Sequence, residues 1–161
     1  MTNTTDEVSK TYIAVQTEDF SLADEYQALR EDNVSDGAVV TFTGCVRDFN
    51  DGSDVKGLFL EHYPGMTQKS LFDIAIEAKI RWPLNRIRII HRVGQLNLSD
   101  QIVFVGVTSA HREAAFAGCE FIMDFLKTRA PFWKKETTPK GDKWVEAKQS
   151  DEQRADKWRQ Q

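Results

Sequence analysis

The hydrophobic residues follow two spacings along the chain, one typical of strands and one typical of helices. Alternating or nearly continuous apolar stretches predict strands, whereas apolar residues three and four positions apart predict helices. The predicted strands are 12–15, 38–46, 55–63, 86–93, 102–109 and a short one at 144–145. The predicted helices are 22–30, 68–82 and 109–127.

The helix boundaries follow from polar caps and from a proline. Ser21, Thr67 and Ser109 precede the three helices. We expect each of them to cap its helix, because a hydroxyl oxygen accepts a hydrogen bond from an exposed N–H of the first turn. Pro131 lacks an N–H and disfavours helical geometry at the residue before it, so the third helix should end near residues 128–130.

Three features of the predicted strands indicate burial, a distortion of the backbone and exposure to solvent. The stretch 102–109 is almost continuously apolar, which predicts a central strand covered on both faces. Gly44, near the end of its strand, predicts a bulge or a close backbone approach just before Arg47. His91 lies among arginines on its strand, and we expect it to be an ordinary surface or interface residue.

The chain has the size and the organisation of one domain. It contains 161 residues and shows no internal repeat or low-complexity segment. We expect a flexible N-terminus at 1–10, a single domain over 11–148 and a polar C-terminal tail at 149–161. That tail is predicted to be either a loose helix or disordered.

The composition excludes several classes of function. The 21 basic and 25 acidic residues give a net charge of −4, which argues against a general nucleic-acid binder. No apolar run approaches the roughly 20 residues that cross a bilayer, and the N-terminus does not resemble a signal peptide. We therefore predict a cytoplasmic protein that binds neither nucleic acid nor membrane.

The two cysteines, Cys45 and Cys119, lie far apart, without a C-x-x-C pair or a nearby histidine cluster. This spacing predicts neither a disulfide framework nor a zinc site, and we expect both side chains to be buried, reduced thiols. The chain also lacks the glycine-rich phosphate and dinucleotide motifs and the G-x-S-x-G motif. No metal and no cofactor are predicted.

A basic segment at 126–136 stands out in this acidic protein. It contains Lys127, Arg129, Lys134 and Lys135 against a single carboxylate, Glu136, so its local charge is +4 − 1 = +3. The two lysines at 127 and 134 should lie on a helix end and on the segment after the bend, so they can converge on one pocket. The alternative is that they remain solvated and complement the helix dipole.

Two further cationic sites lie at predicted element ends. Arg47 follows a strand, although it could instead pair with the aspartates of the next loop. His111 and Arg112 crowd the start of a helix, where exposed N–H groups favour a phosphate or carboxylate, unless Glu113 neutralises them. The helix from 111 to 127 spans roughly 24 Å, so a second copy of the chain must supply one end of any shared site. If these cations act on one ligand, a homodimer with composite sites is the natural proposal.

Lysine is the best candidate for chemistry in this chain. Burial and a neighbouring cation lower the pKa of a lysine, which frees its amine to act as a base or nucleophile. Two alternatives remain from the residues alone. One is a non-enzymatic module that binds an acidic tail or a nucleotide in a basic pocket, and the other is a Schiff-base enzyme.

Four segments together resemble the catalytic (large) subunit of molybdopterin synthase. They are G-A-V-V-T-F-T-G-x-V-R at 37–47, L-E-H-Y-P-G-M at 60–66, I-V-F-V-G-V-T-S-A-H-R at 102–112 and F-L-K-T-R-A-P-F-W-K-K-E at 125–136. The resemblance covers about residues 10–148, with the motifs in the expected order. It implies an α/β (α+β) fold of the hammerhead type with an additional antiparallel β subdomain.

The resemblance also implies a sulfurtransferase of molybdenum cofactor biosynthesis. In that family a small ubiquitin-like subunit carries a C-terminal Gly-Gly thiocarboxylate, and two sulfurs pass from it to cyclic pyranopterin monophosphate. The product is the dithiolene of molybdopterin. The expected assembly is a heterotetramer around a central homodimer of large subunits.

Residue by residue, the resemblance places the catalytic positions at Lys127 and Lys134. It implies that His111 and Arg112 come from the partner large subunit. The implied substrate-binding residues are Cys45, Val46, Arg47, His111, Arg112, Lys127, Lys134, Lys135 and Glu136. Two positions depart from the family pattern: Cys45 stands where a basic residue is common, and Lys148 where an arginine is common.

Overall fold

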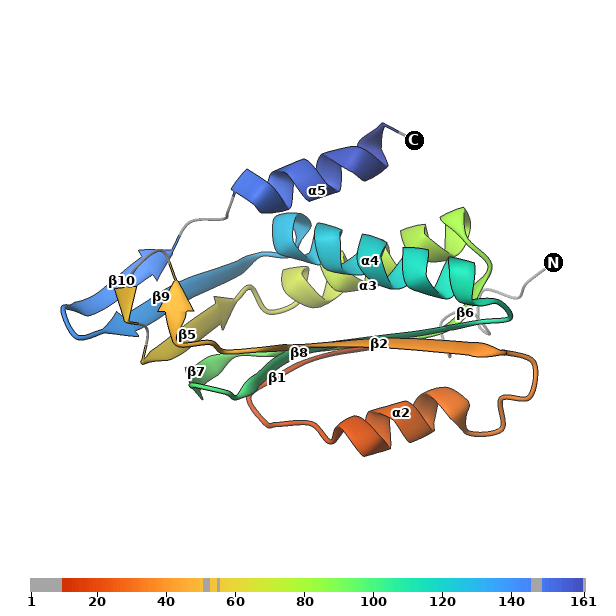
Figure 1. The fold of residues 1–161 in the computed structure, drawn as a ribbon, viewed down its shortest axis with the longest axis horizontal. Coiled ribbons are helices and arrows are strands. Elements are labelled where there is room, and N and C mark those ends of the chain that lie inside the picture. Colours follow the sequence, from red (N-terminus) through yellow and green to blue (C-terminus); the bar gives the residue numbers. More distant parts are fainter. Residues whose placement is uncertain (1–9, 51–52, 55, 146–148, 161) are drawn as a thin grey trace.

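The fold has two four-stranded sheets and helices on both faces of the first (Figure 1). The computed structural model describes residues 10–50, 53–54, 56–145 and 149–160. The first sheet has the order β1-β6-β8-β2, with β1 parallel to β6 and the other pairs antiparallel. Its strands are β1 (Thr11–Gln16), β2 (Ala38–Cys45), β6 (Leu84–Arg92) and β8 (Gln101–Ser109).

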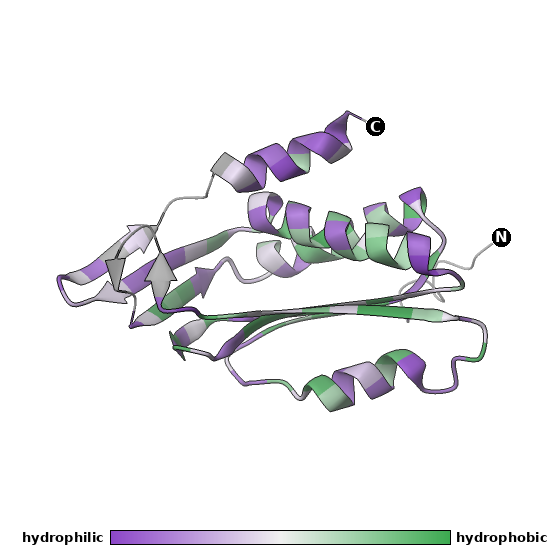
Figure 2. Ribbon diagram, in the orientation of Figure 1, coloured by the Kyte–Doolittle hydropathy of each residue, from purple (hydrophilic) through white to green (hydrophobic). Residues whose placement is uncertain are grey.

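Helices cover this sheet on both sides (Figure 1). Helix α2 (Leu22–Arg30) lies on one face, and α3 (Met66–Arg81) and α4 (Arg112–Arg129) lie on the other. Strand β8 is central and buried along most of its length, as its apolar sequence predicted. Figure 2 shows the hydrophobic colours concentrated on the sheet and on the helix faces that cover it.

The second sheet is antiparallel throughout and has the order β10-β9-β5-β7. It covers a small core made by Val46, Leu58, Leu60, Val93 and Leu96. Its strands are β5 (Gly57–His62), β7 (Gly94–Asn97), β9 (Phe132–Thr138) and β10 (Gly141–Val145), and a separate pair comprises β3 (Phe49–Asn50) and β4 (Ser53–Asp54). The α/β (α+β) fold with an additional antiparallel subdomain is thus confirmed.

The predicted cap of α3 is wrong, because Thr67 has a tertiary role. Gly65 is the N-cap, with φ 83°, and its N–H donates to Oε1 of Gln68 at 2.9 Å. The hydroxyl of Thr67 accepts from the N–H of Tyr63 at 3.0 Å and donates to the carbonyl of Pro131 at 3.1 Å. This buried hydroxyl therefore joins the start of α3 to the bend that follows α4.

The predicted cap of α4 is also wrong. Ser109 is the last residue of β8, and its hydroxyl donates to the carbonyl of Pro83 at 2.9 Å. Helix α4 begins at Arg112, with His111 as an N-cap whose side chain makes no capping hydrogen bond. By contrast, Ser21 caps α2 as predicted, since its hydroxyl accepts from the N–H of Asp24 at 3.3 Å.

Strand β7 was not predicted, whereas the tail forms a helix, which is one of its two predicted states. Strand β7 forms because Leu96 pairs with Leu58 and is buried in the small core. The tail forms helix α5 (Gln149–Arg159), which packs on α4. Trp158 anchors this helix: it is buried, and its Nε1–H donates to Oδ2 of Asp124 at 2.8 Å.

Some predictions fall outside the described residues. They concern residues 1–9 of the N-terminus and Lys148 in the segment 146–148. Across the described ranges, no helix combines the length and the apolar character needed to span a membrane. The division into an N-terminus, a single domain and a tail stays a prediction.

Candidate active site

Several of the predicted site residues lie at the end of the first sheet where the second sheet begins. In the pairing of β2 with β8, Cys45 lies opposite Gln101 and Ala38 lies opposite Ser109. Helix α4 ends at the same end of the sheet as Cys45 (Figure 1). The chain around Arg47, the last turn of α4 and strand β9 therefore share one end of the molecule.

The bend between α4 and β9 is held in place by hydrogen bonds. Helix α4 ends at Arg129, as Pro131 predicted. The N–H of Phe132 donates to the carbonyl of Ala130 at 2.9 Å, and the Thr67 hydroxyl binds the next carbonyl, that of Pro131. Lys127 lies exposed on the last turn of α4 before this bend, and β9 continues after it.

Lys134 and Glu136 share the inner face of β9. Lys134 pairs with Leu60 and Glu136 with Leu58, and directly opposed residues of an antiparallel pair lie on the same face. Both leucines are buried in the small core, and only 4 % of Glu136 is exposed. Lys134 is half-buried. The inner face of β9 therefore combines apolar packing with one cation and one carboxylate.

Lys135 lies on the opposite face of β9. Its Nζ is 3.4 Å from Oδ2 of Asp142 and 5.7 Å from the ring centroid of Trp144. Trp133 shares this outer face by strand alternation, and its ring centroid is 5.4 Å from that of Tyr63. The structure thus separates the side chain of Lys135 from those of Lys134 and Glu136. A substrate-binding role for Lys135 stays a prediction.

His91 was expected at the surface or at an interface, but only 4 % of it is exposed. Its ring stacks on that of Phe132, with centroids 3.7 Å apart and planes 19° from parallel. Burial, and after it the electrostatic effect of Lys127 and His62, lowers the pKa of His91 from 6.5 to about 3. His91 is therefore a buried, neutral residue next to the bend.

One signal in the sequence could have placed His91 inside. Side chains two residues apart on a strand share a face. His91 follows Ile87 and Ile89 at this spacing, and both isoleucines are fully buried in the main core. The neighbouring arginines, which suggested a surface position, alternate with these residues.

The Cys45–Arg47 segment leaves β2 next to the small core. Val46 is buried there, and its backbone bonds to Asp100 and Ser99, with N···O distances of 2.9 and 2.7 Å. The register shift between Gly44 and Cys45 confirms the predicted bulge. Cys45 is exposed rather than buried, because the bulge comes directly before it and the strand ends there.

Of two further predicted residues, Cys119 is buried and Arg47 is exposed. Cys119 is a buried free thiol, as predicted, and burial raises its pKa to about 12. Arg47 is exposed beyond the end of β2. The alternative that it pairs with loop aspartates falls partly on residues 51–52, which lie outside the described residues.

His111 and Arg112 are exposed at the opposite end of α4 from Lys127. They follow Ser109, which pairs with Ala38 at the far end of the first sheet. A single chain therefore does not bring them to Lys127, in agreement with the length expected for this helix. A role for His111 and Arg112 in the same site as Lys127 stays a prediction, and it would need a second chain.

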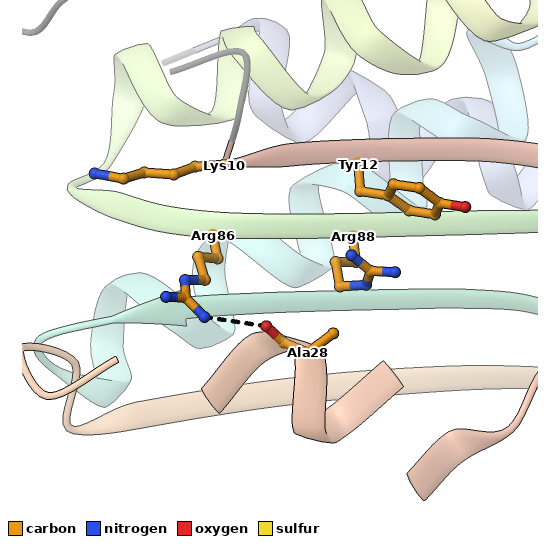
Figure 3. A pocket seen from close by; sticks show the side chains of 5 residues that line it. All are labelled: Lys10, Tyr12, Ala28, Arg86 and Arg88. Atoms are coloured by element: carbon orange, nitrogen blue, oxygen red, sulfur yellow. Dashed lines mark hydrogen bonds between the residues drawn. The ribbon is translucent and has the colours of Figure 1, made fainter. Parts of the chain in front are cut away.

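A separate basic cleft lies beneath α2, on the other face of the first sheet (Figure 3). Its volume is about 310 Å³. Arg86 donates to the carbonyl of Ala28 at 3.0 Å, and Nε of Arg88 donates to Glu25 at 2.6 Å. These arginines hold α2 on the sheet. The cleft is lined by Lys10, Tyr12, Ala28, Arg86 and Arg88.

The fold and the site together define a class: an α/β protein with a basic, partly apolar site where two sheets meet. Among the described residues, no group of three or more His, Cys, Asp or Glu side chains is placed to hold a metal ion. The described site residues are lysine side chains next to a buried face. Such a site suits an anionic substrate.

Comparison with known proteins identifies the family. A family profile described as MoaE protein matches residues 15–129. The molybdopterin synthase catalytic subunit of Vibrio cholerae is 60 % identical over 146 residues, which are 91 % of this chain and 97 % of that protein. The corresponding subunit of Escherichia coli K12 is 58 % identical over 151 residues, 94 % of this chain and 100 % of that protein.

Solved structures agree with this similarity. The MoaE protein of Burkholderia ambifaria superposes with a TM-score of 0.79 at 51 % identity, over 92 % of this chain and 97 % of that one. Molybdopterin synthase from Staphylococcus aureus gives a TM-score of 0.77 at 34 % identity, over 82 % and 95 %. A complex of subunits 1 and 2 of molybdopterin-converting factor from Helicobacter pylori shares the fold, with a TM-score of 0.66 at 19 % identity, over 86 % and 90 %.

The chain belongs to the MoaE family, the catalytic subunits of molybdopterin synthase. Its function is that of a sulfurtransferase in molybdenum cofactor biosynthesis. Of the functions that the residues alone left open, an enzyme is therefore favoured over a non-enzymatic binding module.

Proposed function

We propose that the chain transfers sulfur from the C-terminal thiocarboxylate of a small ubiquitin-like subunit to cyclic pyranopterin monophosphate, forming the dithiolene of molybdopterin. The observation that carries this proposal is the position of Lys127 at the bend where α4 meets the inner face of β9. Lys134 and Glu136 lie on that face. Both the thiocarboxylate and the cyclic phosphate are anions, and cations in a partly dry site bind anions strongly.

We assign different roles to the two lysines. Lys127 moves a proton or captures the acyl group transiently, because it lies on the last turn of α4, directly before the hydrogen-bonded bend. Lys134 stabilises the developing negative charge from the half-buried face of β9. Cys45 and Arg47, exposed on either side of the buried Val46, border the approach from β2.

The proposed homodimer follows from the open edge of the first sheet. Among the described strands, β2 pairs only with β8, so its other edge is available to a second chain. Phe42, on this strand, is 42 % exposed. Two copies of β2 paired antiparallel about a two-fold axis would bring Ala38 of each chain next to Cys45 of the other.

This pairing of two β2 strands would also bring His111 and Arg112 of one chain to the site of the other. Ser109 lies opposite Ala38 within each chain, and His111 and Arg112 follow it directly. The dimer would therefore deliver His111 and Arg112 of one chain to the end of the sheet that carries Arg47 and Lys127 of the other.

The small subunit is the second proposed partner. The Helicobacter pylori structure that shares this fold is a complex of two subunits, which supports a similar complex here. With a central dimer of large subunits, the assembly would be a heterotetramer. We keep the predicted cytoplasmic location as part of this proposal, to be tested by cell fractionation.

The test is direct reconstitution. The chain is incubated with thiocarboxylated small subunit and cyclic pyranopterin monophosphate, and the dithiolene product is measured. Lys127→Ala should abolish product while the variant still binds the small subunit, and Lys134→Ala should lower the rate strongly. Lys69→Ala is the matched control, since this exposed lysine pairs only locally with Asp73 at 2.8 Å. Near-normal activity of Lys127→Ala would refute the assignment.

A further inference from the structure

His91 and Phe132 form a joint between the two sheets. His91 lies near the end of β6 in the first sheet, and Phe132 is the first residue of β9 in the second. Their rings are nearly parallel, with centroids 3.7 Å apart. Phe132 also packs against both the main core and the small core. The stack therefore fixes how the second sheet leaves the first.

The orientation of the His91 ring is itself fixed. Its Nδ1 lies 2.8 Å from the backbone carbonyl of Arg92. Because a carbonyl only accepts hydrogen bonds, Nδ1 carries the proton and donates it. The ring is thus held on one side by its own strand and on its face by Phe132.

Lys127 and Lys134 stand on either side of this joint. Lys127 lies two residues before the end of α4, and Lys134 lies two residues after Phe132. The positive charge of Lys127 is close enough to His91 to lower the pKa of its imidazole. Any rotation of the chain at Phe132 would change the separation of the two lysines.

We propose that His91 is a positioning residue of the sulfur-transfer site, whose flat ring, stacked on Phe132, holds the bend that directs Lys127 and Lys134 toward one pocket. This inference rests on the proposed function of the two lysines. His91 itself does not touch the reacting atoms. The stack holds the geometry of the two catalytic groups, and a displacement of about 1 Å at such groups lowers a rate roughly 100-fold.

Two variants distinguish the effect of the planar ring on the rate from the effect of the imidazole nitrogens. His91→Phe keeps a planar ring against Phe132, whereas His91→Leu keeps apolar volume without a plane. Neither variant retains the hydrogen bond to Arg92, so this loss is common to both. Ile90→Ala is a third variant and serves as the control for lost stability, because Ile90 is buried on the opposite face of the same strand, in the core beneath α2.

The experiment measures single-turnover sulfur transfer, binding of the small subunit and the folded fraction for each variant. His91→Leu should lose roughly 10- to 100-fold in rate with binding within about 3-fold of wild type, and His91→Phe should recover to within about 3-fold. Ile90→Ala should lose stability but keep its rate per folded molecule. Equal rates for His91→Leu and His91→Phe, or an equal loss in Ile90→Ala, would overturn the positioning role.

The outcomes distinguish a failure of the positioning role from a failure of the proposed function. If wild type forms product and Lys127→Ala does not, the function stands whatever the His91 variants do. If Lys127→Ala is fully active, the proposed role of Lys127 fails before the His91 variants are compared.

Discussion

The buried imidazole of His91 makes a quantitative prediction about stability and pH. The perturbation is His91→Phe, which keeps the ring against Phe132 and removes the titratable group. In the folded protein the pKa of His91 is lowered from 6.5 to about 3 by burial, and then by the charges of Lys127 and His62. An unfolded chain binds a proton at this position below pH 6.5, whereas the folded chain does not.

The sign follows from this difference in proton binding. Because the folded pKa is depressed, the stability contributed by a neutral His91 is fully present above pH 6.5 and is lost as the pH falls toward 3. One pH unit within that window corresponds to about 1.4 kcal/mol. Between pH 7.5 and pH 4.5, wild type should therefore lose about 2.5 kcal/mol that the phenylalanine variant does not lose.

The assay is urea denaturation of both proteins, at equal protein concentration, at pH 7.5, 6.5, 5.5 and 4.5. Taking the difference between the two proteins at each pH cancels the groups that titrate identically in both. His62 and Lys127 face the same site and are retained in the variant. A difference that stays constant across these four pH values would refute the buried, neutral state of His91.

Three further substitutions test packing and hydrogen bonds. Trp158→Phe should lower the free energy of unfolding by about 1–3 kcal/mol in urea denaturation, because it leaves the buried carboxylate of Asp124 without its indole donor at 2.8 Å; an unchanged value would show that α5 does not depend on this bond. Gly118→Val should lower the melting temperature, since even a Cβ would lie 2.5 Å from Cδ1 of Leu84, and such overpacking costs about 1–3 kcal/mol; a wild-type melting temperature would contradict that close contact. Thr67→Val should lower the free energy of unfolding by about 1–3 kcal/mol and slow sulfur transfer, because it removes the hydroxyl that bonds to the bend after α4. A loss of stability at an unchanged rate would show that the activity does not depend on this bond to the bend.

The helix and strand pattern of the first sheet was accessible from the sequence. The apolar run 102–109 identified the central strand, and Pro131 located the end of α4. These predictions succeed because they rest on local properties, namely apolar periodicity and the missing N–H of proline.

Other features depend on contacts that are distant in sequence. Thr67 and Ser109 have the residue type of helix caps, but their hydroxyls bond to Pro131 and Pro83 instead. Strand β7 exists because Leu96 is buried against a strand that comes nearly 40 residues earlier in the chain. Nothing local distinguishes these positions from an ordinary cap or turn.

In the candidate site, too, the sequence predicted the local features and missed those that depend on the fold. The sequence located Lys127 on the last turn of α4 and Lys134 after the bend, and both positions are confirmed. It did not separate Lys135 from Lys134, because no strand was predicted at 132–138, and adjacent side chains point to opposite faces only where the chain is a strand. It also missed His91, whose burial depends on the aromatic ring of Phe132 from the other sheet.

The most direct test of the composite site is complementation between two inactive chains. Lys127→Ala and Arg112→Ala are each prepared alone and then co-expressed, and dithiolene formation is measured. If each site takes Lys127 from one chain and Arg112 from its partner, a mixed dimer contains one intact site. Random assortment should then restore about a quarter of wild-type activity. If both residues serve a site within the same chain, every site carries one defect, and the absence of any recovery would contradict the account.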